Sequence, residues 1–192
     1  MFIQTEVTPN PNTLKFIPGQ ILLDKGSYDF ENAEAADRSP LALRMFNIEG
    51  IKGVFIGEDF ISITKENDKD WDTLKPHILS DLMDHLVANK PIILEGRSAQ
   101  EEANLAEEKV DYSDEEQKIV QEIKELLDSR VRPAVAVDGG DIIFNKFVNG
   151  VVYLKMRGAC SGCPSSAVTL KNGIENMLRY YVPEVIEVKQ VD

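Results

Sequence analysis

Two cysteines, Cys160 and Cys163, are the only thiols in this chain of 192 residues. They lie three positions apart, and a thiol pair at this spacing can bind a metal ion or a cluster, or can form a redox-active disulfide. A tetrahedral zinc ion or an iron–sulfur cluster usually takes four protein ligands. The two histidines, His77 and His85, are distant in the sequence. A site made entirely of thiolates would therefore require a second copy of the chain.

The cysteine pair lies between a β-rich run and a segment that begins with Pro164, a residue suited to the first position of a helix. Cys163 is then the predicted N-cap. We expect an exposed loop whose cysteines lie close to the free amides and the positive end of the helix dipole, which lower a thiol pKa. Gly158 and Gly162 leave room for backbone amides and for the loop of another subunit.

Three basic residues flank the motif: Lys155, Arg157 and Lys171. An all-thiolate cluster is anionic, so these cations would help to hold it. They also fit an ordinary solvated face, because exposed lysines and arginines are common on any protein surface.

Several functions are compatible with the cysteine pair. The first is an iron–sulfur cluster shared across a homodimer, the second a dithiol–disulfide redox protein, and the third a zinc bridge of four cysteines in a dimeric interaction module. The motif follows a predicted hairpin rather than a βαβ unit, and proline follows the second cysteine. Both observations weigh against the redox interpretation. Zinc stays open because thiolates bind it well. Two buried, inert cysteines are a further alternative, which the glycine-rich helix start disfavours.

Composition excludes other classes. The net charge is −12 and the sequence has no basic stripe, which argues against a nucleic-acid partner. No apolar run reaches the roughly 18 residues of a membrane span. The first residues have neither a basic lead-in nor an apolar signal core. A bacterial cytoplasm is favoured by the start at Met1, with the mitochondrial matrix as the alternative if a targeting peptide was removed.

Charge also divides the chain. Residues 98–117 contain eight acidic residues and one basic residue, and the stretch 97–111 has almost no large apolar side chains. Such a segment cannot dock an apolar face and is typical of a linker. We predict an α+β protein of two small domains, 1–97 and 113–192, joined by an acidic linker over 98–112.

The C-terminal domain is predicted to have the order α-β-β-α-β. Ser113 and Glu116 have the spacing of a capping box, and the helix that they start should end at Pro133. A turn over 138–141 precedes two strands, 142–148 and 151–157, which are joined by Asn149-Gly150. That dipeptide favours a type I′ turn. A helix from Pro164 to about residue 181 and a strand over 185–191 complete the domain.

The N-terminal domain shows weaker signals. We expect strands over 2–7 and 13–17 around the turn 8–12, and a short helix that starts at Ser39-Pro40 and ends at Gly50. A hairpin over 53–56 and 60–64, a helix over 71–87 and a short strand over 91–94 follow. His77 and His85 are expected to be surface or partly packed residues of that helix. Trp71 and Phe46 are expected in the core.

Three motifs in 131–166 resemble the C-terminal NifU-like domain of Nfu iron–sulfur carrier proteins. They are VRP at 131–133, DGGD at 138–141 and GACSGCPSS at 158–166. Three stretches of the first half resemble the Nfu N-terminal domain: TPNPNTLKF at 8–16, SPLA at 39–42 and FNIEGIKGVF at 46–55. The resemblance spans both domains in the order of the family.

The resemblance implies a scaffold and carrier for iron–sulfur cluster assembly. Nfu proteins accept a cluster, [4Fe-4S] in type, from an upstream donor and deliver it to apo-protein clients. The family's cluster is bridged between two subunits, so that Cys160 and Cys163 of each protomer would be its ligands in a homodimer. The N-terminal domain would help with client recognition or cluster handover. The resemblance implies no catalytic residues, and the chain is expected not to be an enzyme.

Overall fold

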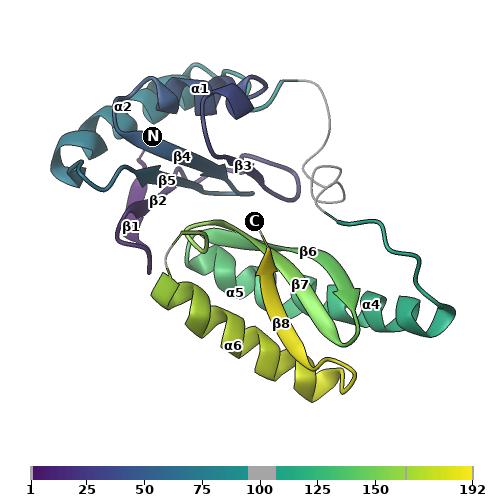
Figure 1. Cartoon of the computed structure of the whole chain (residues 1–192). Coiled ribbons are helices and arrows are strands. Elements are labelled where there is room, and N and C mark those ends of the chain that lie inside the picture. The colour runs from purple at the N-terminus through teal and green to yellow at the C-terminus, as the bar shows by residue number, and fades with distance from the viewer. Residues whose placement is uncertain (1, 95–106, 163, 192) are drawn as a thin grey trace.

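The computed structural model describes residues 2–94, 107–162 and 164–191, which form two α+β domains that lie against each other (Figure 1). The predicted linker 98–112 falls partly outside the described residues, and 107–112 contain neither helix nor strand. The domain boundaries stay a prediction. None of the helices in the described ranges is both long and apolar enough to span a membrane.

The N-terminal domain is an antiparallel sheet with helices on one face. Its strands are β1 (Gln4–Val7), β2 (Thr13–Ile17), β3 (Tyr28–Phe30), β4 (Ile51–Ile56) and β5 (Ile61–Lys65), in the order β1-β2-β5-β4-β3. The helices are α1 (Pro40–Phe46) and α2 (Trp71–Val87), with a short 3-10 turn, η1 (Glu34–Ala36), before them. Alternate residues, such as Leu14 and Phe16 on β2, join the helices in one core, because side chains alternate between the faces of a strand.

Most of the predicted elements of this domain are confirmed. Ser39 caps α1 by accepting a hydrogen bond from the amide of Ala42 at 3.0 Å. The predicted strand over 91–94 is wrong. The carbonyl of Ile92 accepts a hydrogen bond from the Ser39 hydroxyl (2.8 Å), and the Leu94 amide bonds to the Arg38 carbonyl (2.8 Å). The backbone polar groups of this segment therefore hydrogen-bond to the start of α1 and not to a neighbouring strand. The short strand β3 was not predicted.

The C-terminal domain packs helices on a three-stranded sheet. It contains α4 (Asp114–Leu126), a π-helical turn η2 (Leu127–Val131), α5 (Arg132–Val137), β6 (Gly140–Val148), β7 (Val151–Gly158), α6 (Pro164–Tyr181) and β8 (Glu187–Val191). β6 and β7 are antiparallel, and β8 joins β7 in parallel after the α6 crossover. The core gathers Ile123, Leu127, Leu154, Leu178 and Val188 between helices and sheet.

Pro133 does not end the helix, contrary to the prediction. The helical path runs from α4 through the π-turn η2 into α5, and Pro133 lies in the first turn of α5. A π-turn re-registers the backbone bonds, so the missing N–H of proline falls where no intrahelical partner is needed. The Ser113–Glu116 capping box and the Asn149-Gly150 turn, with φ of 52° and 77°, are confirmed.

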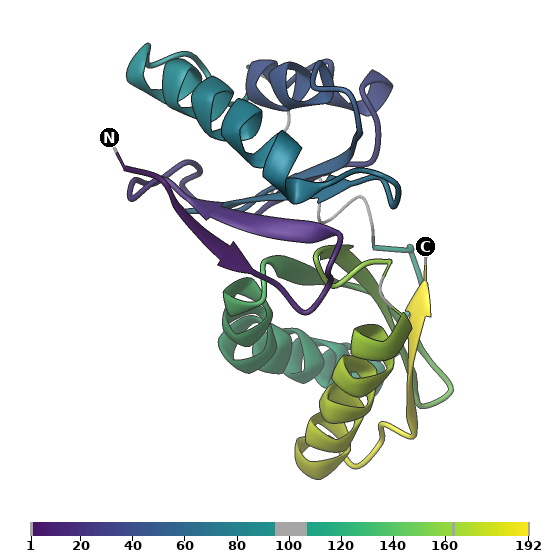
Figure 2. The same ribbon diagram turned by 90° about the vertical axis from the view of Figure 1, so that its left-hand side faces the viewer.

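The second face of the N-terminal sheet, opposite α1 and α2, rests on the C-terminal domain. Figure 2 shows the β1–β2 hairpin reaching down to the ends of α5 and α6. Lys15 Nζ donates to the carbonyl oxygens of Ala136 (2.8 Å) and Val137 (3.2 Å), and Ser62 Oγ donates to that of Gly139 (2.7 Å). The two domains therefore meet beside the segment that contains the cysteines.

Candidate functional site

The cysteine loop connects β7 to α6. Gly158 (φ 61°) and Gly162 (φ 78°) adopt left-handed backbone conformations, and the amide and hydroxyl of Ser161 both donate to the Gly158 carbonyl, at 3.1 Å and 2.9 Å. These contacts make a tight turn, which glycine permits at no steric cost. The helix begins at Pro164 as predicted. Cys163 lies outside the described residues, so its predicted role as N-cap stays a prediction.

Cys160 is buried, with 6% of its surface exposed, in the core of the C-terminal domain. Its Sγ lies against Gly140, where even a Cβ atom would overlap the sulfur. Burial, with a smaller contribution from the Asp138 and Asp141 carboxylates, raises the pKa of the Cys160 thiol to about 12. The predicted exposed loop and lowered pKa are therefore wrong for Cys160. The residue lies four positions before α6 and packs into its own domain, where desolvation disfavours the thiolate.

The flanking bases do not form one solvated face. Arg157 is buried, and its Nε and Nη1 have no hydrogen-bond partner among the described residues. Its positive charge interacts with Asp29 of β3, which also accepts a hydrogen bond from the Gly158 amide. Lys155 and Lys171 are half-buried. The interpretation as ordinary surface is therefore wrong for Arg157, which belongs to the junction between the domains.

The histidines lie apart from the cysteine loop. Both are on α2, which covers the far face of the N-terminal sheet. His77 is exposed, whereas His85 is buried and its Nε2 lies 3.0 Å from the Pro91 carbonyl oxygen. Within 2–94, 107–162 and 164–191, no group of three or more His, Cys, Asp and Glu side chains could hold a metal ion.

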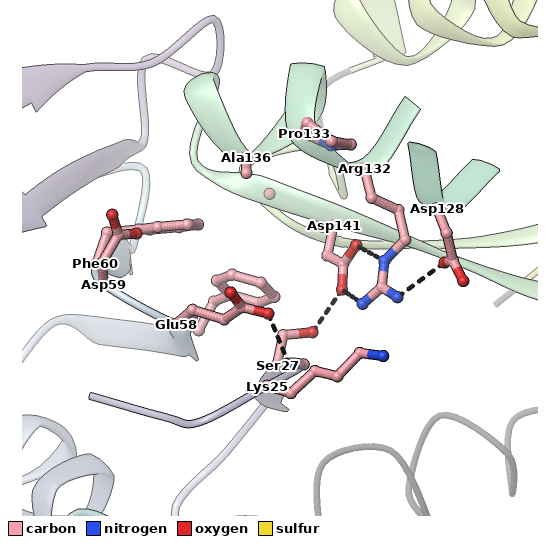
Figure 3. Close-up of a pocket in the computed structure, with 14 residues that line it drawn as sticks. Lys25, Ser27, Glu58, Asp59, Phe60, Asp128, Arg132, Pro133, Ala136 and Asp141 are labelled. Carbon is pink, nitrogen blue, oxygen red and sulfur yellow. Dashed lines mark hydrogen bonds and ion pairs between the residues drawn. The ribbon is translucent and has the colours of Figure 1, made fainter. Parts of the chain in front are cut away.

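A polar network lines a cavity of about 410 Å³ at the domain junction (Figure 3). Asp141 binds Arg132 through two hydrogen bonds of 2.8 Å and accepts a third, of 2.6 Å, from the Ser27 hydroxyl of the other domain. Arg132 also bonds to Asp128 at 3.1 Å. These acidic partners raise the pKa of Arg132 further above its ordinary value. The network joins the two domains and keeps the buried Asp141 carboxylate paired.

Two neighbours of the cysteine loop were not recognised from the sequence. Gly140 contacts the sulfur of Cys160, and the turn 8–12 of the N-terminal domain reaches the loop. Asn10 Nδ2 donates to the Ser161 carbonyl at 3.3 Å, and Pro9 lines a small cavity of about 40 Å³ together with Cys160. The sequence showed the Gly139-Gly140 pair and the Pro-Asn-Pro-Asn run only as turns, because no local pattern states what a turn will contact.

Two solved structures resemble parts of the chain. A NifU-like protein from Saccharomyces cerevisiae, solved by NMR, is 29% identical with a TM-score of 0.45, over 50% of this chain and 87% of that one. The crystal structure of protein SAV1430 from Staphylococcus aureus is also 29% identical, with a TM-score of 0.39, over 43% of this chain and 99% of that one.

Both domains are matched by family models and by relatives that align along the whole of this chain. The model "Scaffold protein Nfu/NifU N terminal" matches residues 3–89, and "NifU-like domain" matches 123–189. The human protein "NFU1 iron-sulfur cluster scaffold homolog, mitochondrial" is 50% identical over all of this chain and 72% of its own length. The protein of the same name from Drosophila persimilis is 52% identical, and this chain spans 65% of it. The chain therefore belongs to the Nfu family of iron–sulfur cluster scaffold proteins.

Proposed function

We propose that the chain binds an iron–sulfur cluster, [4Fe-4S] in type, between two copies of itself, through Cys160 and Cys163 of each. One observation supports this most strongly: the only two thiols of a cluster-scaffold chain lie in one loop between β7 and α6. Four thiolates are the usual ligand set of such a cluster, and one chain supplies two.

The state of Cys160 weighs against a dithiol–disulfide redox protein. The attacking group in thiol–disulfide exchange is the thiolate, and redox motifs lower a cysteine pKa to supply it. Burial does the opposite at Cys160, whose pKa it raises to about 12. A metal can still bind such a thiol, because metal binding and loss of the thiol proton occur together.

Cluster binding requires Cys160 to turn away from Gly140. Its Sγ is enclosed in the described form, whereas a ligand must reach the iron at roughly 2.3 Å, the usual length of a metal–thiolate bond. The loop offers glycines on both sides of Cys160, and a Cβ at Gly162 would meet nothing within 4 Å. The loop can therefore rearrange without displacing a packed side chain at that position.

A cluster held between two such loops has few ties to either chain, which suits a carrier rather than an enzyme. The cargo arrives from an upstream donor and leaves by exchange with the thiolates of an apo-protein client. The names of the mitochondrial relatives favour the mitochondrial matrix over the bacterial cytoplasm as the site of this work.

Cysteine variants test the ligand assignment. After anaerobic reconstitution with iron and sulfide, we expect Cys160→Ser and Cys163→Ser to retain less than a tenth of the wild-type iron. Ser161→Ala, a matched change in the same loop, should retain nearly all of it. Circular dichroism checks that each variant is folded. A full-strength cluster in either cysteine variant would contradict the assignment, and one tight zinc ion per two chains in place of a cluster would favour the zinc bridge.

A further inference from the structure

A row of four residues crosses the second face of the N-terminal sheet, one from each of four adjacent strands. Lys15 of β2 pairs with Ser62 of β5, Ser62 with Phe55 of β4, and Phe55 with Asp29 of β3. We call these four residues the docking row. Lys15, Ser62 and Phe55 are buried at 8%, 1% and 2% exposure, although they face away from the helices.

Every member of the docking row contacts the C-terminal domain. Lys15 donates to the last carbonyls of α5, and Ser62 donates to the Gly139 carbonyl. Asp29 accepts from the Gly158 amide, and Phe55 lies where a Cβ at Gly158 would be 2.9 Å from its ring. The carbonyls at a helix C-terminus lack intrahelical donors and favour a cation. The docking row therefore supplies hydrogen-bond partners to backbone groups at the end of α5 and next to the cysteine loop.

Two glycines permit this close approach. A Cβ at Gly139 would lie 2.8 Å from Ser62 Oγ and 3.2 Å from the Thr8 methyl group, and Gly158 is equally confined by Phe55. Both glycines have positive φ, at 83° and 61°. The backbone that leads into the cysteine loop is thus shaped to receive the other domain.

The same contact between the domains extends to the cysteine loop at Ser161 and Cys160. The turn 8–12 hydrogen-bonds the loop through Asn10 and Ser161, and Pro9 borders the cavity next to Cys160. A cluster shared between two chains needs the partner's loop within a few ångströms of this sulfur. The turn and a second chain would then need the same space.

We propose that the N-terminal domain is an intramolecular cap on the cysteine loop, and that it competes with the second copy of the chain for that loop. This inference rests on the proposed function, because the competitor is the cluster-bridged dimer. Docking lowers the population of chains that are competent to load, so the apparent affinity for a cluster falls by the same fraction. Undocking frees the cysteine loop and, at the same time, exposes the docking row.

Ser62→Asp is the sharpest test. It replaces a hydroxyl that donates to the Gly139 carbonyl with a carboxylate that cannot donate, and it buries a charge when the domains dock. In the undocked chain this carboxylate is solvated beside its cross-strand neighbour Lys15. The matched control is Ser80→Asp, the same change at an exposed position of α2. Lys15→Met, which removes the bonds to α5, is a second test variant, and circular dichroism verifies folding.

Small-angle X-ray scattering of the apo monomer tests docking without any cluster. The docked chain should have a radius of gyration of about 16 Å, the value for one compact body of this length. Wild type and Ser80→Asp should show it, and Ser62→Asp and Lys15→Met should exceed it by several ångströms. A wild-type chain as extended as Ser62→Asp would overturn the cap.

Cluster loading tests the competition. Under limiting iron and sulfide, Ser62→Asp should form the cluster-bound dimer at least threefold faster than wild type and Ser80→Asp. Equal rates in a variant that scattering shows to be open would overturn the competition and leave the proposed function intact. A wild-type chain that takes up no cluster at all would overturn the proposed function and the competition with it, while scattering would still decide whether the domains dock.

Discussion

Cys160, which we propose as a cluster ligand, has the surroundings of a core residue. Its sulfur packs against Gly140 and is flanked by Asp138 and Asp141, so both desolvation and negative charge oppose ionisation. A protected thiol would suit the proposed carrier while it holds no cluster, because oxidation and exchange act on accessible thiolates.

The raised pKa predicts slow alkylation of Cys160. In a Cys163→Ser background, where Cys160 is the only thiol, the rate with iodoacetamide at pH 7.5 should be more than 100-fold below that of the same chain in denaturing urea. A pKa of about 12 against about 8.5 for a free thiol accounts for this difference. The folded-chain rate should still rise tenfold per pH unit between pH 8 and 10, and equal rates in the two states would show that the thiol is not buried.

The β6–β7 hairpin depends on its turn. Gly150 has a φ of 77°, and a Cβ there would lie 2.6 Å from Ile186 Cδ1 and 3.0 Å from the Glu184 carbonyl oxygen. The turn therefore also packs against the residues that immediately precede β8. Both strands that lead to the cysteine loop, β6 and β7, are aligned by this one dipeptide.

Gly150→Ala should lower the free energy of unfolding by about 1–2 kcal/mol, because alanine must adopt a positive φ and displace Ile186. The matched control is Gly173→Ala in the interior of α6, where a Cβ meets nothing within 4 Å. That variant should gain about 0.5–1 kcal/mol from helix propensity. Urea denaturation measures both, and a loss below about 0.5 kcal/mol at Gly150 would contradict the type I′ geometry.

Local signals predicted elements well where one turn or cap decides them. The Asn149-Gly150 turn, the Ser113–Glu116 capping box and the helix after Pro164 follow from the chemistry of a few neighbouring residues. Pro133 misled the prediction because the π-turn before it changes the hydrogen-bond register, and no local pattern announces that change.

At the scale of the whole molecule, the N-terminal sheet is covered on both faces. Helices α1 and α2 cover one face, and the C-terminal domain covers the other through the docking row. Sequence patterns predicted two domains and a linker but not this contact, because polar residues such as Lys15 and Ser62 look solvent-exposed in a strand. The burial of Cys160 was not predicted because Gly140 and Pro9, which are distant in the sequence, approach it only in the folded chain.

Asp29 makes the stability of this arrangement depend on pH. Burial raises its pKa to about 6, although Arg157 opposes the shift. Below about pH 4 the group is protonated in both folded and unfolded chains. Between pH 4 and 6 the unfolded chain releases the proton while the folded chain retains it, so stability falls as pH rises and then levels off above 6.

The Asp29→Asn variant lacks this titration. Relative to it, wild type should lose on the order of 2 kcal/mol of unfolding free energy between pH 4 and 7, after allowance for the screening of a half-buried group. Urea denaturation of both chains at each pH gives the difference. A difference that does not change with pH, or that grows in favour of wild type, would show that Arg157 governs the charge of Asp29.

The composition of the reconstituted protein decides whether two chains share one cluster. Iron and sulfide are counted per chain, Mössbauer spectra give the cluster type, and light scattering gives the mass. We expect four irons and four sulfides per two chains, with a mass twice that of the chain's 21.5 kDa. A cluster on a monomer, or a chain that binds no iron and forms a reversible Cys160–Cys163 disulfide instead, would contradict it.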